Sequence, residues 1–302
     1  MRLHSFFYIV NNQNSNRDDK LYKVRPLIHS LSLAYQKYYI LNKEISIDEK
    51  MIKYTGRVSF LQYVQNKPTR LGFKVFVLSD ALSGYVFNWH FYTGAGSQRT
   101  NNLARNIVVE LVQGLEFKFH HVYFDSYYSS IELAQELAQK GFGCVGTINK
   151  RRRFLPQAIK NPSEPLQQGE TLSRKLGNLV SLIHKDKREI RLITTIHGKQ
   201  LSASGKPQAL VDYNIYMRGI DKGNQNSAYY HNNHKSLKWW KTIFNSLIKV
   251  SINNAYILYK TRNPFTARTP LKFRERLVEQ LIELYLREIH HQRVASLHAG
   301  KL

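Results

Sequence analysis

The order of the apolar runs constrains the fold of this chain more than any other feature. Three strand-like runs come first, separated by turn signals at 67–68 and 83–84, and they cover residues 45–54, 73–79 and 85–92. From residue 100 the apolar residues follow a helical period, and helix, strand, helix and strand alternate as far as residue 148. We therefore expect an antiparallel meander followed by strands that helices cross over, which together make an α/β sheet.

This succession of three strands, helix, strand, helix and strand is the order of an RNase H-like core. In such a core the first and fourth strands lie side by side. The fourth strand is the short run from His121 to Phe124, and the helix after it has capping-box spacing at Ser129 and Glu132. The spacing of the runs agrees with this topology without proving it.

The remaining chain divides by composition. Residues 148–210 hold 13 basic and 4 acidic residues together with further β-type runs, which predicts a basic, mainly β insertion. Apolar residues at helical spacing then predict two amphipathic helices, one from Ile243 to Ala255 and one from Leu277 to Ile289, and we expect both to face the core. The predicted parts are an N-terminal helical lead-in at 1–45, the first part of the core at 46–147, the insertion at 148–210, and the completion of the core with C-terminal helices at 211–302.

Charge narrows the class of partner. The 302 residues include 45 Lys and Arg against 21 Asp and Glu, a formal net charge of +24. This excess predicts a nucleic-acid partner, because neutralising phosphates releases counterions, although ribosomal and membrane-surface proteins are also basic. The single cysteine, Cys144, excludes a disulfide framework and a cysteine-rich zinc finger. No run approaches the roughly 18 apolar residues of a membrane span, so we expect no membrane partner.

Against this positive background three acidic residues stand out, because each lies at the edge of an apolar segment. They are Asp48, Asp125 and Asp221. If the fold brings them together, their carboxylates form a cage of hard oxygen ligands for divalent cations, which suits the cutting and joining of DNA. From the residues alone, solvated surface charge is the default alternative for any three of 21 acidic residues.

Motifs surround these aspartates in a fixed order between Leu21 and Lys260. The first series comprises 46–52, 56–60, Tyr63, 66–68, 72–76 and 92–94; the second comprises 124–130, Gly146, Thr147, Leu155 and Pro156; the third comprises 206–207, 213–214, Met217, 219–221, Gln225, 229–230, 238–240 and 254–256. Several independent motifs in one order are highly specific. In these motifs the chain resembles the piggyBac family of DNA transposases.

The resemblance implies an RNase H-like catalytic domain in which Asp48, Asp125 and Asp221 coordinate metal. Two Mg²⁺ ions about 4 Å apart, or Mn²⁺ in their place, would serve the attacking and leaving oxygens of phosphoryl transfer. The resemblance further implies strand cleavage at transposon ends, formation of a donor hairpin and transfer into TTAA targets, with double-stranded DNA as the partner. It leaves a homodimer open.

The chain also departs from the family pattern. The family usually has a further aspartate three residues after the third acid, and this chain has Asn224 there. The amide oxygen of Asn224 is a candidate ligand, but it is neutral, so we expect weaker metal binding.

Candidate DNA contacts lie in two basic segments. We predict them at Arg151, Arg152, Arg153, Lys235, Lys238, Trp239 and Trp240. The alternatives are a solvated charged loop for the three arginines and a helix core for at least one of the two tryptophans.

Two functions from different classes remain. The first is a transposase that cleaves DNA and transfers strands. The second is a truncated or domesticated transposase-derived protein that binds DNA without catalysis, which Asn224 and the absence of the cysteine-rich C-terminal domain of many relatives favour. An RNA-binding protein is a distant third, because no RNA-binding motif is visible. DNA chemistry, together with the basic run from Lys150 to Arg153, predicts residence in the nucleus.

Overall fold

The computed structural model describes residues 9–10, 16, 18–65, 67–94, 102–219 and 236–299, with side chains as far as Ile289. Three predicted site residues, Asp221, Asn224 and Lys235, lie outside the described residues. The helices are α1 (Arg25–Tyr38), α2 (Leu103–Leu111), α3 (Ile131–Gln139), α4 (Gln157–Lys160), α5 (Gln208–Tyr216), α7 (Trp239–Arg262) and α8 (Pro270–Ala299). The strands are β1 (Glu44–Lys53), β2 (Gln62–Tyr63), β3 (Leu71–Asp80), β4 (Val86–Phe91), β5 (His121–Phe124), β6 (Gly143–Thr147), β7 (Thr171–Leu176), β8 (Leu179–Lys185) and β9 (Glu189–Thr194).

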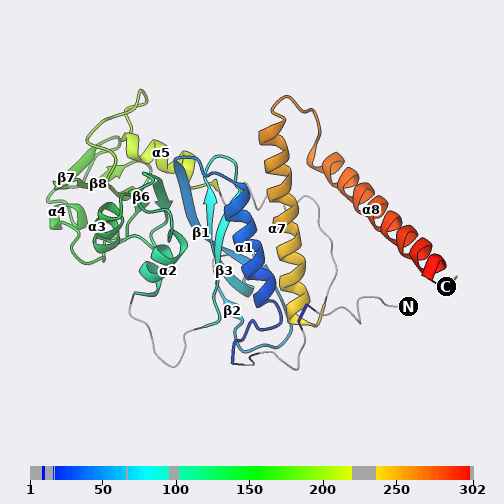
Figure 1. Ribbon diagram of the computed structural model, residues 1–302. Helices are drawn as coiled ribbons and strands as arrows, with labels where there is room; N and C mark the ends of the chain where they lie inside the picture. Colours follow the sequence, from blue (N-terminus) through cyan, green and yellow to red (C-terminus); the bar gives the residue numbers. More distant parts are fainter. Residues whose placement is uncertain are drawn as a thin grey trace.

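One mixed sheet runs through the molecule in the order β2-β3-β1-β5-β6-β9-β8-β7, with β4 also paired to β3 (Figure 1). β3 is antiparallel to both β1 and β4, so the predicted meander is confirmed. β1 and β5 are parallel neighbours, which confirms that the first and fourth strands of the core lie side by side. The fold is therefore the predicted α/β, RNase H-like one.

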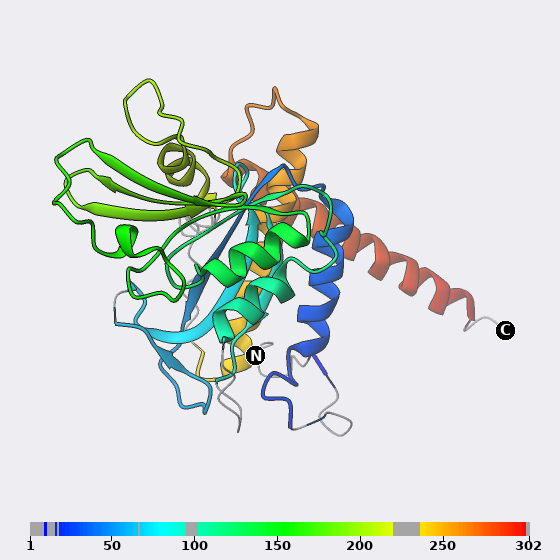
Figure 2. The ribbon, with the colours of Figure 1, turned by 90° about the vertical axis from the view of Figure 1, so that its left-hand side faces the viewer.

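The basic segment after β6 continues this sheet. β7, β8 and β9 form an antiparallel ribbon, and β9 also pairs with β6, so its hydrogen bonds join the ribbon to the core (Figure 2). The predicted β-rich character of this segment is confirmed. Its predicted boundaries, like those of the other parts, stay predictions.

Helices α1 and α7 pack together beside the meander (Figure 1). The Tyr35 hydroxyl lies 2.7 Å from that of Ser251, and the Asn254 side chain bonds both backbone groups of Val86, at 3.0 and 2.8 Å. On α7, Ile243 and Leu247 are fully buried. The prediction that this helix faces the core is therefore confirmed, and polar contacts fix its register against α1 and β4.

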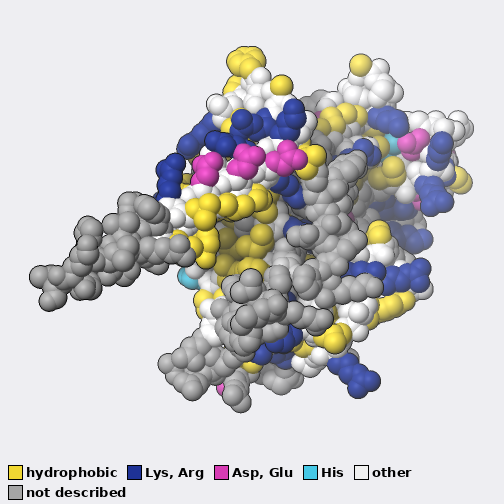
Figure 3. Space-filling model, turned by 90° about the vertical axis from the view of Figure 1, so that its right-hand side faces the viewer, with side chains coloured by type: hydrophobic (Ala, Val, Ile, Leu, Met, Phe, Trp, Pro, Cys, Tyr) yellow, Lys and Arg dark blue, Asp and Glu magenta, His cyan; other side chains and the backbone are white. Residues whose placement is uncertain are grey.

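Helix α8 contradicts the expectation that the last helix faces the core. It projects from the body of the protein in both ribbon views, and seven of its large apolar side chains are exposed, including Leu281 at 58% and Tyr285 at 63% (Figures 1 and 2). Apolar side chains form a band next to a row of acidic ones along this helix (Figure 3). An amphipathic pattern predicts a helix with one apolar face, but it does not specify whether that face meets this chain or another surface.

A smaller correction concerns the start of α3. Ser130, not Ser129, is the N-cap, and its hydroxyl accepts a hydrogen bond from the Leu133 N–H at 3.1 Å. The Ser129 hydroxyl instead donates to the Asp125 carbonyl at 3.0 Å. Within the described ranges, no helix is long and apolar enough to cross a membrane.

Candidate metal centre

The first two acids are positioned by the end of β5 and by the middle of its parallel neighbour β1. In the β1–β5 pair the last register partners are Ile47 and Phe124. Asp48 and Asp125 are the residues that follow this pair, so they lie next to each other across the two strands, at the point where β5 ends. β1 continues beyond this point beside β3, which leaves its other edge open next to the turn that Asp125 begins. The sequence showed each aspartate at the edge of an apolar segment, and the structure brings the two together.

A hydrogen-bonded turn holds Asp125 in place. The Tyr127 N–H donates to Asp125 Oδ1 at 2.9 Å, and the Asp125 carbonyl accepts from the Ser129 N–H and hydroxyl. Gly146 on the neighbouring strand makes room for this turn, because a Cβ there would lie 2.3 Å from Ser129 Oγ and 2.6 Å from the Phe124 ring. Short side-chain to backbone bonds of this kind fix a carboxylate without closing it to other ligands.

A third carboxylate joins the pair. Oxygens of Asp48, Glu49 and Asp125 lie within 4.8 Å of one another, all three residues being partly buried. Lys67, from the connection between β2 and β3, lies 3.0 Å from Glu49 Oε1 and 3.8 Å from Asp48 Oδ1. The Tyr128 hydroxyl donates to Glu49 Oε2 at 3.3 Å. Sequence reasoning assigned no role to Glu49, because alternation along a strand puts residues 48 and 49 on opposite faces.

Burial and mutual repulsion set the charges of the cluster. Burial raises the pKa of Asp48 to about 7, against the lowering effect of Lys67 and with the added repulsion of Glu49. Burial also raises the pKa of Asp125, partly offset by the hydrogen bond from Tyr127. For Glu49 burial acts in the same direction, but its contact with Lys67 outweighs it, so the net pKa is lowered. The site therefore has three acidic groups, and the single ammonium group of Lys67 cannot neutralise all of them.

The residues fit a divalent cation. Three carboxylates converge within ligand distance, and their oxygens are the donors that Mg²⁺ and Mn²⁺ prefer. The Lys67 ammonium group already occupies the position of a cationic partner, which shows that the cluster is shaped around positive charge. Among the described residues, no other group of three or more His, Cys, Asp or Glu side chains converges in this way.

The chain after α5 returns to β1 next to this site. Gly219 packs so closely there that a Cβ would lie 2.6 Å from Ser46 Oγ and 2.8 Å from the Ala81 Cα. The Tyr213 hydroxyl on α5 lies 3.3 Å from Thr147 Oγ1, and its pKa is raised by burial and by the charges of Asp125 and Asp48. Gly219, the last described residue before the predicted third acid, thus lies against Ser46, which is two residues before Asp48 on β1.

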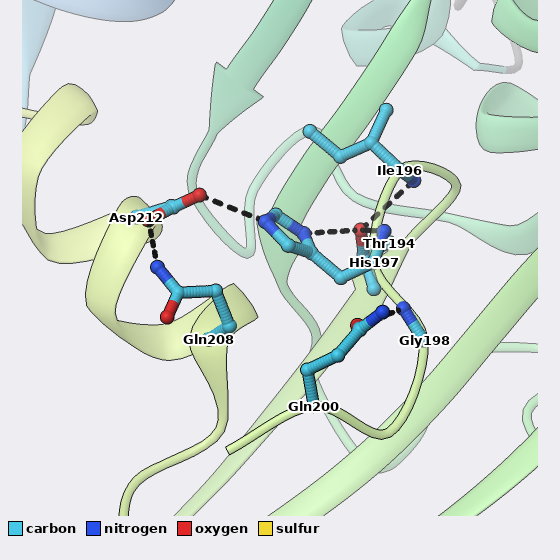
Figure 4. A network of polar contacts seen from close by, with 7 residues as sticks. All are labelled: Thr194, Ile196, His197, Gly198, Gln200, Gln208 and Asp212. Atoms are coloured by element: carbon cyan, nitrogen blue, oxygen red, sulfur yellow. Dashed lines mark hydrogen bonds and ion pairs between the residues drawn. The ribbon is translucent and has the colours of Figure 1, made fainter. Parts of the chain in front are cut away.

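A polar network holds α5 against the sheet (Figure 4). His197 Nε2 lies 2.8 Å from Asp212 Oδ2, and His197 Nδ1 lies 3.0 Å from Thr194 Oγ1 at the end of β9. The Gln208 amide donates to the other oxygen of Asp212 at 2.7 Å. This network determines where the chain leaves α5, and nothing in the sequence motifs indicated it.

The predicted DNA contacts fall into two groups. Arg151, Arg152 and Arg153 follow β6, and Arg152 donates to the carbonyls of Ser126 and Tyr127, at 3.0 and 2.6 Å. This loop therefore lies against the turn that holds Asp125.

The two tryptophans sit at the start of α7. Trp240 is 6% exposed and belongs to the core, while Trp239 is partly buried against Phe60. Trp240 thus has the core position that the alternative predicted, and it is not available for stacking on a base in this structure. Lys238 is exposed immediately before the helix. Its contact with DNA, like that of Trp239, stays a prediction.

With this geometry established, comparison with known proteins is informative. A family model described as Transposase IS4 matches residues 3–256. This chain belongs to that family, in its piggyBac type. The human PiggyBac transposable element-derived protein 2 is 25% identical in an alignment of length 284, which covers 85% of this chain and 47% of the relative. The human PiggyBac transposable element-derived protein 3 is 23% identical over 304 residues, covering 93% of this chain and 51% of the relative.

A solved structure confirms the fold of this piggyBac-type chain. The cryo-EM structure of a piggyBac transposase synaptic complex with hairpin DNA aligns with a TM-score of 0.83 at 24% identity, over 90% of this chain and 59% of that one. The present chain spans about half the length of the curated relatives named above. The likeness to the solved structure therefore shows the fold of the matched part.

Proposed function

We propose that this chain carries the catalytic site of a piggyBac-type transposase, which cleaves and joins DNA strands by metal-dependent phosphoryl transfer. The observation that carries the proposal is the meeting of Asp48 and Asp125, which belong to separate motifs and come together with Glu49 within 4.8 Å where β5 ends beside its parallel neighbour β1. Family membership supports the same kind of activity.

In this proposal the carboxylates of Asp48 and Asp125 hold two divalent cations, Mg²⁺ or Mn²⁺. Such cations supply Lewis acidity to the attacking and leaving oxygens of an in-line displacement. The Tyr127 N–H keeps the Asp125 carboxylate oriented, and Tyr128 does the same for Glu49. Lys67 compensates part of the charge of the acids in the absence of cations.

We further propose that Asp221 completes the site, with Asn224 as an additional neutral ligand. Support comes from the close approach of Gly219, two residues before Asp221, to Ser46, which lies two residues before Asp48 on β1. Replacing Gly219 with alanine should push the chain away and reduce cleavage, whereas Gly198→Ala should not, because a Cβ there meets only the flexible end of Gln200. Equal activity of the two variants would argue against Asp221 as a ligand.

Strand cleavage provides the test of the main proposal. Labelled duplexes that carry candidate transposon ends, incubated with the protein and Mg²⁺ or Mn²⁺, should yield nicked, hairpin and TTAA-inserted products. Asp125→Asn should abolish them, because it removes a charged ligand while keeping the side-chain size. Products that form equally well with Asp125→Asn, or without divalent cation, would contradict the proposal.

A second function, DNA binding without catalysis, is favoured by one observation. Asn224 replaces the acid that the family usually has, which removes a negative charge from the proposed site. If the chain binds these duplexes but does not cleave them, Asn224→Asp discriminates between the alternatives. Activity gained by that change identifies a site that lost its function by this substitution, and no gain supports a protein that retains only DNA binding.

The proposed partner and location follow from the same function. We propose double-stranded DNA, including transposon ends and a TTAA target, as the partner, and the nucleus as the location. We also propose a homodimer, because α8 exposes seven large apolar side chains, more than scattered surface residues account for. Light scattering should show a dimer that Leu281→Glu converts to a monomer.

A further inference from the structure

The loop after β6 displays an aromatic side chain in an unusual backbone conformation. Phe154 has φ 58°, in the left-handed region that bulky residues avoid, and its side chain is 67% exposed. Its neighbour Leu155 is 3% exposed and anchors the loop in the core. Phe117 and Phe119 share the left-handed φ and the exposure, so what distinguishes Phe154 is its place in the arginine-rich loop after β6.

The loop is attached to the metal centre. Arg152 donates two hydrogen bonds to the carbonyls of Ser126 and Tyr127, the two residues that follow Asp125. Asn149 braces the start of the loop, since its side-chain oxygen accepts from the Arg151 N–H at 2.9 Å and its carbonyl from the Arg152 N–H at 3.0 Å. Phe154 follows two residues after Arg152. The ring therefore belongs to a loop that is hydrogen-bonded to the turn that holds Asp125.

The surroundings of the ring are cationic. Residues 148–160 contain five basic and no acidic side chains. The Arg153 guanidinium group lies 5.9 Å from the centroid of the Phe154 ring. An aromatic ring among cationic side chains is an arrangement that can stack on an unpaired base of a nucleic acid while the cations contact its phosphates.

From these observations we infer that Phe154 stacks on an unpaired nucleobase of the DNA strand held at the metal centre, while Arg151 and Arg153 contact the adjacent phosphates. The inference rests on the proposed function for the identity of the DNA, but stacking itself requires no cleavage. In this inference the acids of the site act on the phosphodiester, and Phe154 adds a preference for a DNA strand whose bases are locally unpaired.

The test uses the full chain in EDTA, so that no strand is cut. The probes are a single-stranded oligonucleotide with one 2-aminopurine and the fully paired duplex of the same sequence. Phe154→Asn removes the ring, and asparagine tolerates a left-handed φ, so the loop should keep its shape. Phe154→Trp keeps an aromatic surface. Phe119→Asn is the matched control, because Phe119 is also 71% exposed with φ 58° but precedes β5, at the end of that strand away from Asp125.

We expect Phe154→Asn to bind the single strand about 5- to 150-fold more weakly and to lose the quenching of 2-aminopurine. Phe154→Trp should retain both, and Phe119→Asn should behave as the original chain. Binding of the paired duplex should change little. Unchanged binding and quenching in Phe154→Asn would overturn the inference. An equal loss of binding in Phe119→Asn, or an equal loss on the paired duplex, would overturn it as well.

This outcome is separable from that of the cleavage assay. Cleavage without an effect of Phe154 would leave the proposed function standing and remove the stacking inference. Stacking without cleavage would leave the inference standing for a protein that only binds DNA.

Discussion

Lys67 Nζ lies 3.0 Å from Glu49 Oε1, so a residue from the connection between β2 and β3 compensates an acid on the central strand of the site. The second carboxylate of the cluster, Asp48, lies 3.8 Å from the same ammonium group. Burial tends to lower the pKa of Lys67, but these two charges raise it on balance. The ammonium group therefore stays protonated and balances part of the negative charge of the acidic cluster.

Replacing Lys67 by methionine should destabilise the metal-free protein by about 1–3 kcal/mol, because it leaves partly buried carboxylates without their cation. Mg²⁺ should recover most of the loss by supplying positive charge at the same place. Thermal unfolding with and without Mg²⁺ measures both effects. Lys53→Met, at the exposed end of β1, is the control and should show neither effect. A metal-induced gain that is equal in the two variants would contradict the role of Lys67.

The pH dependence of stability should reveal Asp48. Its pKa rises from an ordinary value of 3.8 to about 7 in the folded protein, so between these values the folded state binds more protons than the unfolded one. Without metal, stability should therefore fall as pH rises from about 4 to 7 and then level off. Asp48→Asn should remove this part of the slope and stabilise the metal-free protein at pH 8 on the order of 2 kcal/mol.

Urea unfolding across this pH range, in EDTA, measures the slope. An unchanged slope in Asp48→Asn would show that its carboxyl group is not the buried acid that the structure indicates. Divalent cation should invert the comparison, because it binds the ionised form and favours the original residue.

Loss of the Asp212 carboxylate should loosen α5. Asp212→Ala leaves His197 without its 2.8 Å partner and Gln208 without its acceptor, so the network of Figure 4 loses its centre. Hydrogen exchange should become faster in α5 and remain slow in β1, and strand cleavage should decrease because the chain that leads to Gly219 is less well positioned. Asp186→Ala, which removes an exposed pair with Lys206, is the control. Unchanged exchange in α5 would contradict the structural role of the network.

The meeting of Asp48 and Asp125 was predictable from the order of the strands, which makes the first and fourth strands neighbours, together with the motifs that resemble the piggyBac family. From the residues alone, solvated surface charge was the default for any three of the 21 acidic residues. Glu49 and Lys67 could not be found in this way, because their approach depends on how far β1 extends beyond β5 and on a loop from a different part of the sheet.

The helices show the same limit. The apolar stripe of α7 was correctly assigned to the core, but that of α8 was not, although both have helical spacing. Periodicity specifies that one face is apolar, and tertiary structure decides what covers it. The one-residue shift of the cap from Ser129 to Ser130 has a local cause, since Ser129 bonds the Asp125 carbonyl instead.

Direct titration of metal tests the central claim, that Asp48 and Asp125 hold divalent cation together. The quantity to measure is the amount of Mn²⁺ bound per chain, for the original chain, Asp48→Asn and Asp125→Asn. Binding is detected as a loss of the free Mn²⁺ signal in electron paramagnetic resonance. The proposed site predicts saturable binding that either substitution weakens by at least tenfold, while Asp186→Asn on the ribbon surface leaves it unchanged. Binding that is unaffected by both site substitutions, or absent from the original chain, would contradict it.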